Sequence, residues 1–203
     1  SETLLAFTDW EAFTPENTLN TITWLIRASQ KDPNCPNLYA ITLHACSLLP
    51  HDHFNSLVEK MPDLIIMLFE QAQNDKPAFR LARTTAEAML ARVFTAYTDL
   101  GHAKWVGLQQ KSPGMMNSIL SYLLYVGDAS SSYNSGVTFV ESYLQASTGD
   151  ALILLGKNHP NTLTSLAKMA KQEISTLTRL THALGSLPSQ DLLCLQKYNA
   201  EFF

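Results

Sequence analysis

Residues 77–100 read PAFRLARTTAEAMLARVFTAYTDL, and this stretch is the strongest indication of the fold. Its large apolar residues and alanines recur at steps of three or four, which places them along one side of an α-helix. They are Phe79, Ala82, Ala86, Met89, Val93, Tyr97 and Leu100. Pro77 suits the first turn of a helix and Gly101 suits the position just after one. The stretch therefore predicts a helix about 36 Å long, against which neighbouring helices can pack.

Helical spacing recurs along most of the chain. Helices are predicted over residues 15–31, 38–49, 52–61, 62–69, 115–126, 137–146, 151–155, 160–184 and from 189 onward. Residues 64–69 are apolar nearly all round, so a buried strand is the alternative there. A lone strand would leave its backbone groups unpaired, which favours a helix.

These elements predict an all-α fold, an irregular multi-helix bundle forming one domain over residues 1–203. Within it, residues 1–13 are a candidate docking helix, and the small polar residues 128–136 are expected to form a flexible loop. An armadillo-like or HEAT-like α-solenoid is the alternative, because Pro36, Pro77, Pro113 and Pro160 lie 41, 36 and 47 residues apart.

Charged residues make up 16% of the 203 residues, below the roughly 25% of an ordinary soluble domain. Part of the surface must therefore be uncharged polar, or covered by a partner. The net charge is −4, and residues 1–75 carry ten acidic side chains against three basic ones. Neither half of the chain has a dense row of Lys and Arg with interleaved aromatics, which argues against nucleic-acid binding.

Three cysteines in a chain of this length do not form a disulfide framework, so a reducing, cytoplasmic location is expected. The longest apolar runs, residues 64–69 and 151–155, are far too short to span a bilayer. No basic segment followed by an apolar one indicates a signal peptide. The chain is accordingly expected not to span a membrane.

The richest group of reactive side chains lies in residues 44–53. It contains His44, Cys46, His51, Asp52 and His53. No C-x2-C pair is present, and residues 44 and 46 point to different sides of a helix, which argues against zinc. Cys46 or Cys194 would need a histidine and an oxyanion hole to act as a nucleophile. Because glycine-rich phosphate motifs are also missing, the sequence predicts no cofactor, no metal and no enzyme. A hydrolase or metal site at 44–53 is the less favoured alternative.

The function predicted from the sequence is a non-enzymatic protein-interaction module. Such an adaptor or chaperone-like subunit would hold a partner segment, such as an amphipathic helix, in a groove beside residues 77–100. The alternative is a fragment of a larger helical-repeat scaffold. Aromatic and arginine side chains dominate interface hot spots. The predicted partner-binding residues are Trp10, Phe13, Arg80, Arg83, Trp105 and Tyr133.

Overall fold

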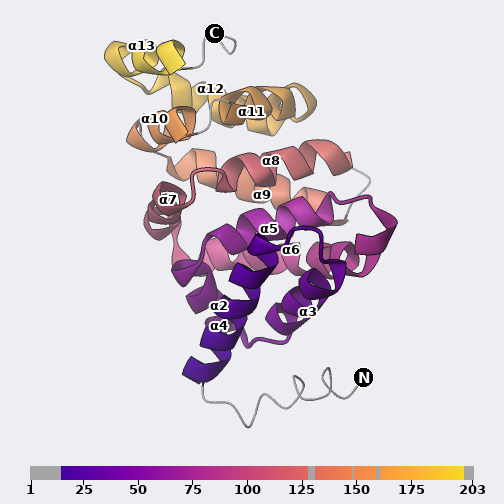
Figure 1. Cartoon of the computed structure of the whole chain (residues 1–203). Helices are drawn as coiled ribbons and strands as arrows, with labels where there is room; N and C mark the ends of the chain where they lie inside the picture. Colours follow the sequence, from indigo (N-terminus) through magenta and orange to yellow (C-terminus); the bar gives the residue numbers. More distant parts are fainter. Residues whose placement is uncertain (1–14, 128–130, 148, 159–160, 199–203) are drawn as a thin grey trace. The chain divides into compact units, whose positions relative to one another are not determined.

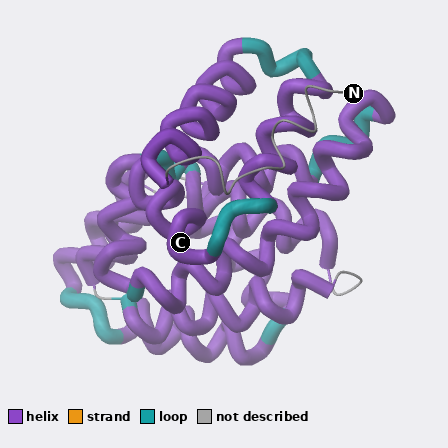
Figure 2. The backbone as a smooth tube through the Cα atoms, turned by 90° about the horizontal axis from the view of Figure 1, so that it is seen from below, coloured by secondary structure: helices purple, strands orange, loops and turns teal. Residues whose placement is uncertain are grey.

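The computed structural model describes residues 15–127, 131–147, 149–158 and 161–198. All regular elements of these residues are helices, as Figures 1 and 2 show. The all-α multi-helix fold predicted from the sequence is thereby confirmed. Residues 64–69 lie in helix α5 (Asp63–Ala72), so the strand alternative was wrong there.

The chain divides into two compact units, Ser1–Ala96 and Tyr97–Phe203. The division falls inside one long helix, α6 (Arg80–Leu100). The first unit also contains α2 (Pro15–Lys31), α3 (Pro36–Ser47), α4 (His51–Lys60), α5 and the 3-10 turn η2 (Pro77–Phe79). The second contains α7 (His102–Lys111), α8 (Met115–Val126), α9 (Ser131–Ala146), α10 (Gly149–Asn158), α11 (Asn161–Gln172), α12 (Ile174–Gly185) and α13 (Ser189–Tyr198).

In the first unit, α2 packs against α3 and α4. Four residues, 32–35, join α2 to α3, and so short a connection makes the two helices antiparallel neighbours (Figure 1). The buried hydroxyl oxygens of Ser29 and Thr42 lie 2.8 Å apart and connect the two helices. These contacts fix which face of α3 packs against α2. Other residues of α3 are left to face η2 and the beginning of α6.

The residues that the spacing predicted to be apolar contacts are buried in α6 and η2, except Leu100, which is only partly buried. Phe79, Ala82, Ala86, Met89, Val93 and Tyr97 are all buried. The first three residues of the predicted helix, Pro77–Phe79, form a 3-10 turn instead. Gly101 closes the helix with φ of +79°, a backbone conformation that other residues rarely adopt.

In the second unit, helices stack in pairs. Helix α8 contacts α9, α11 contacts α12, and the two pairs meet through α8 on α11 and α9 on α12. This equivalent stacking of successive pairs is how helical repeats bury their apolar faces. Helix α10 contacts α7, α11 and α13.

The flexible loop predicted over residues 128–136 is helical from Ser131 onward, because α9 begins there. Residues 128–130 lie outside the described part of the chain. Small residues suggested a linker, but here they allow two helices to approach closely. Gly136 is buried, and a Cβ at this position would lie 3.0 Å from Leu123 Cδ1 and closer still to Cδ2.

The long helix predicted over residues 160–184 is two helices, α11 and α12. Glu173 separates them in an extended conformation, with φ of −120° and ψ of 108°. Its carboxylate accepts a 2.9 Å hydrogen bond from the Tyr133 hydroxyl of α9. No proline or glycine marks this break, so helical spacing alone could not reveal it.

Two helical glycines should respond oppositely to alanine. Gly136→Ala is expected to lower the free energy of unfolding by about 1 kcal/mol, because the added methyl overlaps Leu123. Gly107→Ala should raise it by a similar amount of about 1 kcal/mol, because the space around Gly107 is open and alanine favours a helix. Urea unfolding of both variants measures the difference. Equal effects at the two sites would contradict the close approach of α9 to α8.

Candidate functional site

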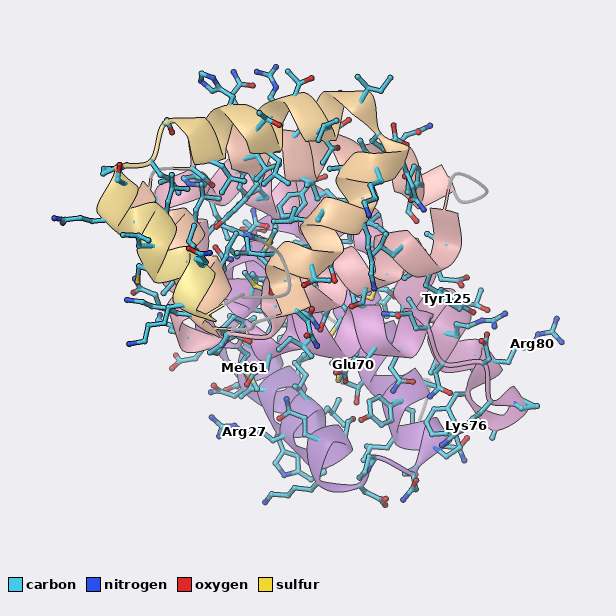
Figure 3. All side chains as sticks on the ribbon, turned by 90° about the horizontal axis from the view of Figure 1, so that it is seen from above. Arg27, Met61, Glu70, Lys76, Arg80 and Tyr125 are labelled. Atoms are coloured by element: carbon cyan, nitrogen blue, oxygen red, sulfur yellow. The ribbon has the colours of Figure 1, made fainter. Side chains whose placement is uncertain are left out.

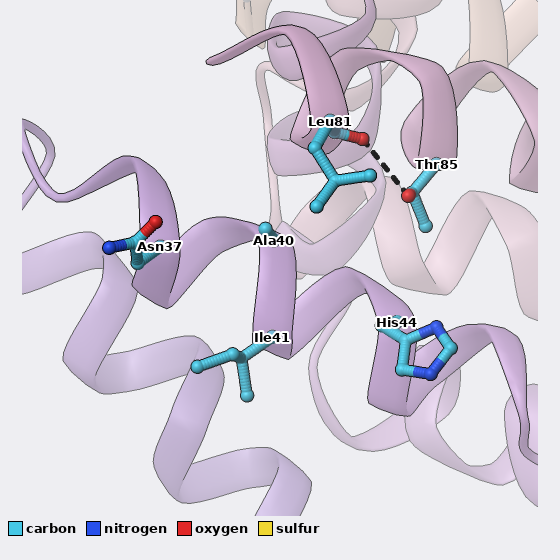
Figure 4. Close-up of a pocket in the computed structure, with 6 residues that line it drawn as sticks. All are labelled: Asn37, Ala40, Ile41, His44, Leu81 and Thr85. Carbon is cyan, nitrogen blue, oxygen red and sulfur yellow. Dashed lines mark hydrogen bonds between the residues drawn. The ribbon is translucent and has the colours of Figure 1, made fainter. Parts of the chain in front are cut away.

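A pocket lies between α3 and the beginning of α6. Its volume is about 560 Å³, within the range of protein binding pockets. The described residues that line it are Asn37, Ala40, Ile41, His44, Leu81 and Thr85. We refer to it as the α3/α6 pocket. Figure 4 shows Leu81 directed from α6 into the space above α3, with Asn37 and His44 toward opposite ends of the α3 wall.

Contacts outside the pocket hold its two walls together. The rings of Tyr39 on α3 and Phe79 in η2 pack edge to face, with centroids 5.9 Å apart. Near the other end of α3, Arg92 of α6 donates hydrogen bonds to backbone carbonyls, among them Ser47 O at 2.9 Å and Leu49 O at 2.6 Å. The walls therefore keep their spacing, and the small side chain of Ala40 leaves the room between them.

The centre of the α3/α6 pocket is apolar. Leu81 is 68% exposed, a large fraction for a leucine in a folded protein. The Thr85 hydroxyl donates a 3.0 Å hydrogen bond to the Leu81 carbonyl, so it needs no acceptor from a ligand (Figure 4). Among the described lining residues, His44 alone has a titratable side chain. These described residues are suited to apolar contact, and His44 has no second titratable side chain among them for acid-base chemistry.

The charged side chains beside the pocket are mainly basic. Arg80 and Lys76 are exposed, and both extend away from the ribbon in Figure 3. Arg83 differs, because its Nη1 lies 2.7 Å from the Asp75 carboxylate and its Nε lies 3.8 Å from Glu87. Arg83 thus fastens the segment before η2 to α6, whereas Arg80 and Lys76 can meet an acidic ligand.

A second pocket lies on the other side of α3, toward α5. Its volume is about 220 Å³, below the usual size of a ligand pocket, and Tyr39 and Glu70 are among its lining residues. Partial burial raises the pKa of the Glu70 carboxyl. Burial, and then the charges of Glu70 and Asp32, raise the pKa of Tyr39. The α3/α6 pocket is larger and more apolar, and it is the better candidate site.

The predicted partner-binding residues fall in different places. Arg80 and Arg83 flank Leu81 on α6, beside the α3/α6 pocket. Trp105 and Tyr133 belong to the second unit and are only 0% and 4% exposed, so the exposure expected for them is not found. Trp10 and Phe13 lie outside the described residues. Two of the predicted residues thus lie beside the pocket, whereas Leu81 and the α3 residues that line it were not among the predicted partner-binding residues.

The side chains of residues 44–53 are spread over different surfaces. His44 lines the pocket, whereas Cys46 on the same helix is fully buried. His53 Nε2 lies 4.0 Å from the Asp52 carboxylate, a contact between neighbours. Within the described residues, no group of three or more His, Cys, Asp or Glu side chains could hold a metal ion. Among all the residues that the structure describes, no helix is long and apolar enough to cross a membrane.

Burial should make Cys46 the slow thiol of the three. Burial raises its pKa from 9.0 to about 12, although the nearby Arg92 charge lowers it. At neutral pH, an aromatic disulfide reagent is expected to react readily with Cys35 and Cys194, which are partly exposed, and slowly with Cys46. Three fast thiols in the native protein would contradict the buried position of Cys46.

The same burial makes stability depend on pH. The unfolded thiol loses its proton near pH 9.0, whereas the folded thiol keeps it until about pH 12. The folded state therefore binds more protons between these values, and stability should fall as pH rises through this range. Cys46→Ala should show a smaller fall than the parent protein in urea unfolding at a series of pH values.

Comparison with known proteins gives no relative. No family model matches the chain, and no curated protein or solved structure matches it either. The functional argument therefore depends on the geometry and chemistry of the α3/α6 pocket.

Proposed function

We propose that this protein is a non-enzymatic interaction module that binds a helical segment of another protein in the α3/α6 pocket. The observation that supports this most is the exposure of Leu81 on the wall of an apolar pocket of about 560 Å³. Leaving a leucine in water costs about 1.5–3 kcal/mol relative to burying it. Because Leu81 is 68% exposed, a partner that covers it recovers the corresponding part of this free energy.

A helix is the favoured form of the partner. Two helices form the walls, and an amphipathic helix presents apolar residues at steps of three and four to such a surface. Its backbone hydrogen bonds are already made, so it does not require polar groups at the centre of the pocket. Arg80 and Lys76 favour acidic residues beside its apolar side chains.

A library of randomised helical peptides, selected for binding to the full chain, tests the proposal. Selected peptides should combine an apolar stripe with acidic residues. Ala40→Trp fills the pocket from the α3 wall and should weaken their binding at least about tenfold. Ala103→Trp is the matched control, because Ala103 is an exposed helical alanine in α7 and does not line the pocket.

Thermal unfolding of both tryptophan variants must first show that they are folded. Equal binding of the selected peptides to Ala40→Trp and Ala103→Trp would reject the pocket as the binding site. Recovery of no binding peptide at all would reject the proposed function.

A further inference from the structure

We propose that residues 1–13 of this chain dock in the α3/α6 pocket and compete there with the partner helix. The inference rests on the proposed function, because it names a ligand within the chain for the same pocket. These residues lie outside the described part of the structure. Their sequence, the charge beside the pocket and the distance from Pro15 carry the argument.

The sequence of residues 1–13 has the chemistry that the pocket requires. Leu4, Phe7, Trp10 and Phe13 follow one another at steps of three, which places them on one broad side of a helix. The segment can thus present an apolar side to Leu81 and Ile41. Phe7, Trp10 and Phe13 supply three aromatic rings within seven residues.

Charge also matches between the segment and the pocket. Residues 1–13 contain three acidic side chains, Glu2, Asp9 and Glu11, and no lysine or arginine. The exposed cations beside the pocket are Arg80 and Lys76. Opposite charges favour this pairing over docking on an acidic part of the same unit.

The segment is long enough to reach the pocket. Thr42 Oγ1 of α3 lies 3.5 Å from the Leu25 carbonyl of α2, so these two residues mark the same level of the antiparallel helices. Pro15 lies ten residues before Leu25, which is about 15 Å along α2. The pocket residues Ile41 and His44 flank Thr42 in the sequence and share its level. A helix over residues 4–13 is about 15 Å long, the same distance that separates Pro15 from the level of the pocket along α2.

Attachment to α2 increases the effect of weak contacts. A short connection gives a tethered segment an effective concentration in the millimolar range. A free partner helix must displace the tethered segment before it can bind. The apparent affinity of the pocket for a partner is therefore lower than its intrinsic affinity. Removal of the segment from the pocket would switch binding on.

Disulfide trapping in the full chain tests the position of the segment. The pair Ala6→Cys and Thr85→Cys places one thiol in the segment and one on the pocket wall, with Cys35 and Cys194 replaced by serine. The control pair is Ala6→Cys and Arg27→Cys, because Arg27 is exposed on α2 at about 18 Å from Pro15. The pocket pair should form a disulfide at least about tenfold faster under mild oxidation than the control pair.

Peptide affinity tests the competition. In the full chain, Phe7→Asp with Trp10→Asp should tighten binding of the library-selected peptides about tenfold, because charged residues remove the segment from the apolar pocket. Ala12→Asp lies on the side of the predicted helix away from Phe7 and Trp10 and should leave affinity unchanged.

Each result supports or rejects one of the two proposals. Equal trapping of both cysteine pairs, with peptide affinity unaltered by Phe7→Asp and Trp10→Asp, rejects docking of residues 1–13. The proposed function then still stands if Ala40→Trp abolishes peptide binding. Selective trapping at Thr85, with no library peptide bound even by the Phe7→Asp and Trp10→Asp variant, supports docking and rejects the partner-binding function.

Discussion

Replacing Arg92 with methionine is expected to lower the free energy of unfolding by about 3 kcal/mol. The Arg92 guanidinium reaches four carbonyl oxygens at the end of α3 and just after it. Nη1 lies 3.2 Å from Cys46 O and 2.9 Å from Ser47 O, and Nη2 lies 2.6 Å from Leu49 O and 3.4 Å from Pro50 O. The last carbonyls of a helix have no partners within it, and a cation at this end is favoured by the helix dipole.

Methionine retains much of the apolar volume of Arg92 but cannot donate these hydrogen bonds. The guanidinium carbon also lies 4.6 Å from the centre of the Phe54 ring, a contact that methionine replaces only in part. Urea unfolding followed by circular dichroism measures the loss of stability. A methionine variant as stable as the parent would show that solvent satisfies these carbonyls equally well.

Arg92→Lys separates the role of charge from that of geometry. Lysine keeps the cation at the end of α3, but its single ammonium group cannot bridge two pairs of carbonyls as the planar guanidinium does. We expect Arg92→Lys to recover less than half of the stability lost in Arg92→Met. Because Arg92 joins the two walls of the α3/α6 pocket, both variants should also weaken peptide binding.

The sequence predicted α6 well because one physical pattern dominates it. Its buried residues form a single stripe, Gly101 marks its end, and Pro77 begins the 3-10 turn directly before it. The pocket was harder to predict. Leu81 lies outside the stripe, directly after Arg80, and such a displaced leucine was the available signal for an exposed binding surface.

The α3 wall could not be recognised from apolar spacing alone. Helix α3 buries Tyr39 and Leu43, while Ile41 is only partly buried and Leu48, directly after the helix, is exposed. Apolar residues thus occur on two sides of α3, so spacing does not say which side faces the core. The choice is made by tertiary contacts with α2 and η2, which join residues distant in sequence.

Trp105 of the second unit was wrongly predicted to be exposed, because the prediction used its residue type alone. Trp105 was predicted to lie at a binding surface because aromatic side chains are common at interfaces. The structure buries Trp105 completely, with Tyr97 at a centroid distance of 5.4 Å and Phe139 at 5.6 Å. Residue type alone cannot separate an interface aromatic from a core aromatic.

Trp105→Ala is therefore expected to lower the free energy of unfolding by about 4 kcal/mol, a typical cost of removing a fully buried tryptophan. The cavity left between Tyr97 and Phe139 removes contacts from both rings, including their edge-to-face packing on the indole. Hydrogen exchange should locate the loss in the second unit, with faster exchange in α7 and α9. Protection unchanged in these helices would contradict a central role for Trp105.

Trp105→Phe is the informative control. Among the described residues, no acceptor reaches the indole Nε1, although it is buried. An unpaired buried N–H costs about 1–3 kcal/mol, so phenylalanine loses ring area but also removes this cost. We expect Trp105→Phe to destabilise the protein by about 1 kcal/mol or less. A loss as large as that of Trp105→Ala would mean that the indole N–H has a hydrogen-bond partner in solution, and that its removal leaves that partner unsatisfied.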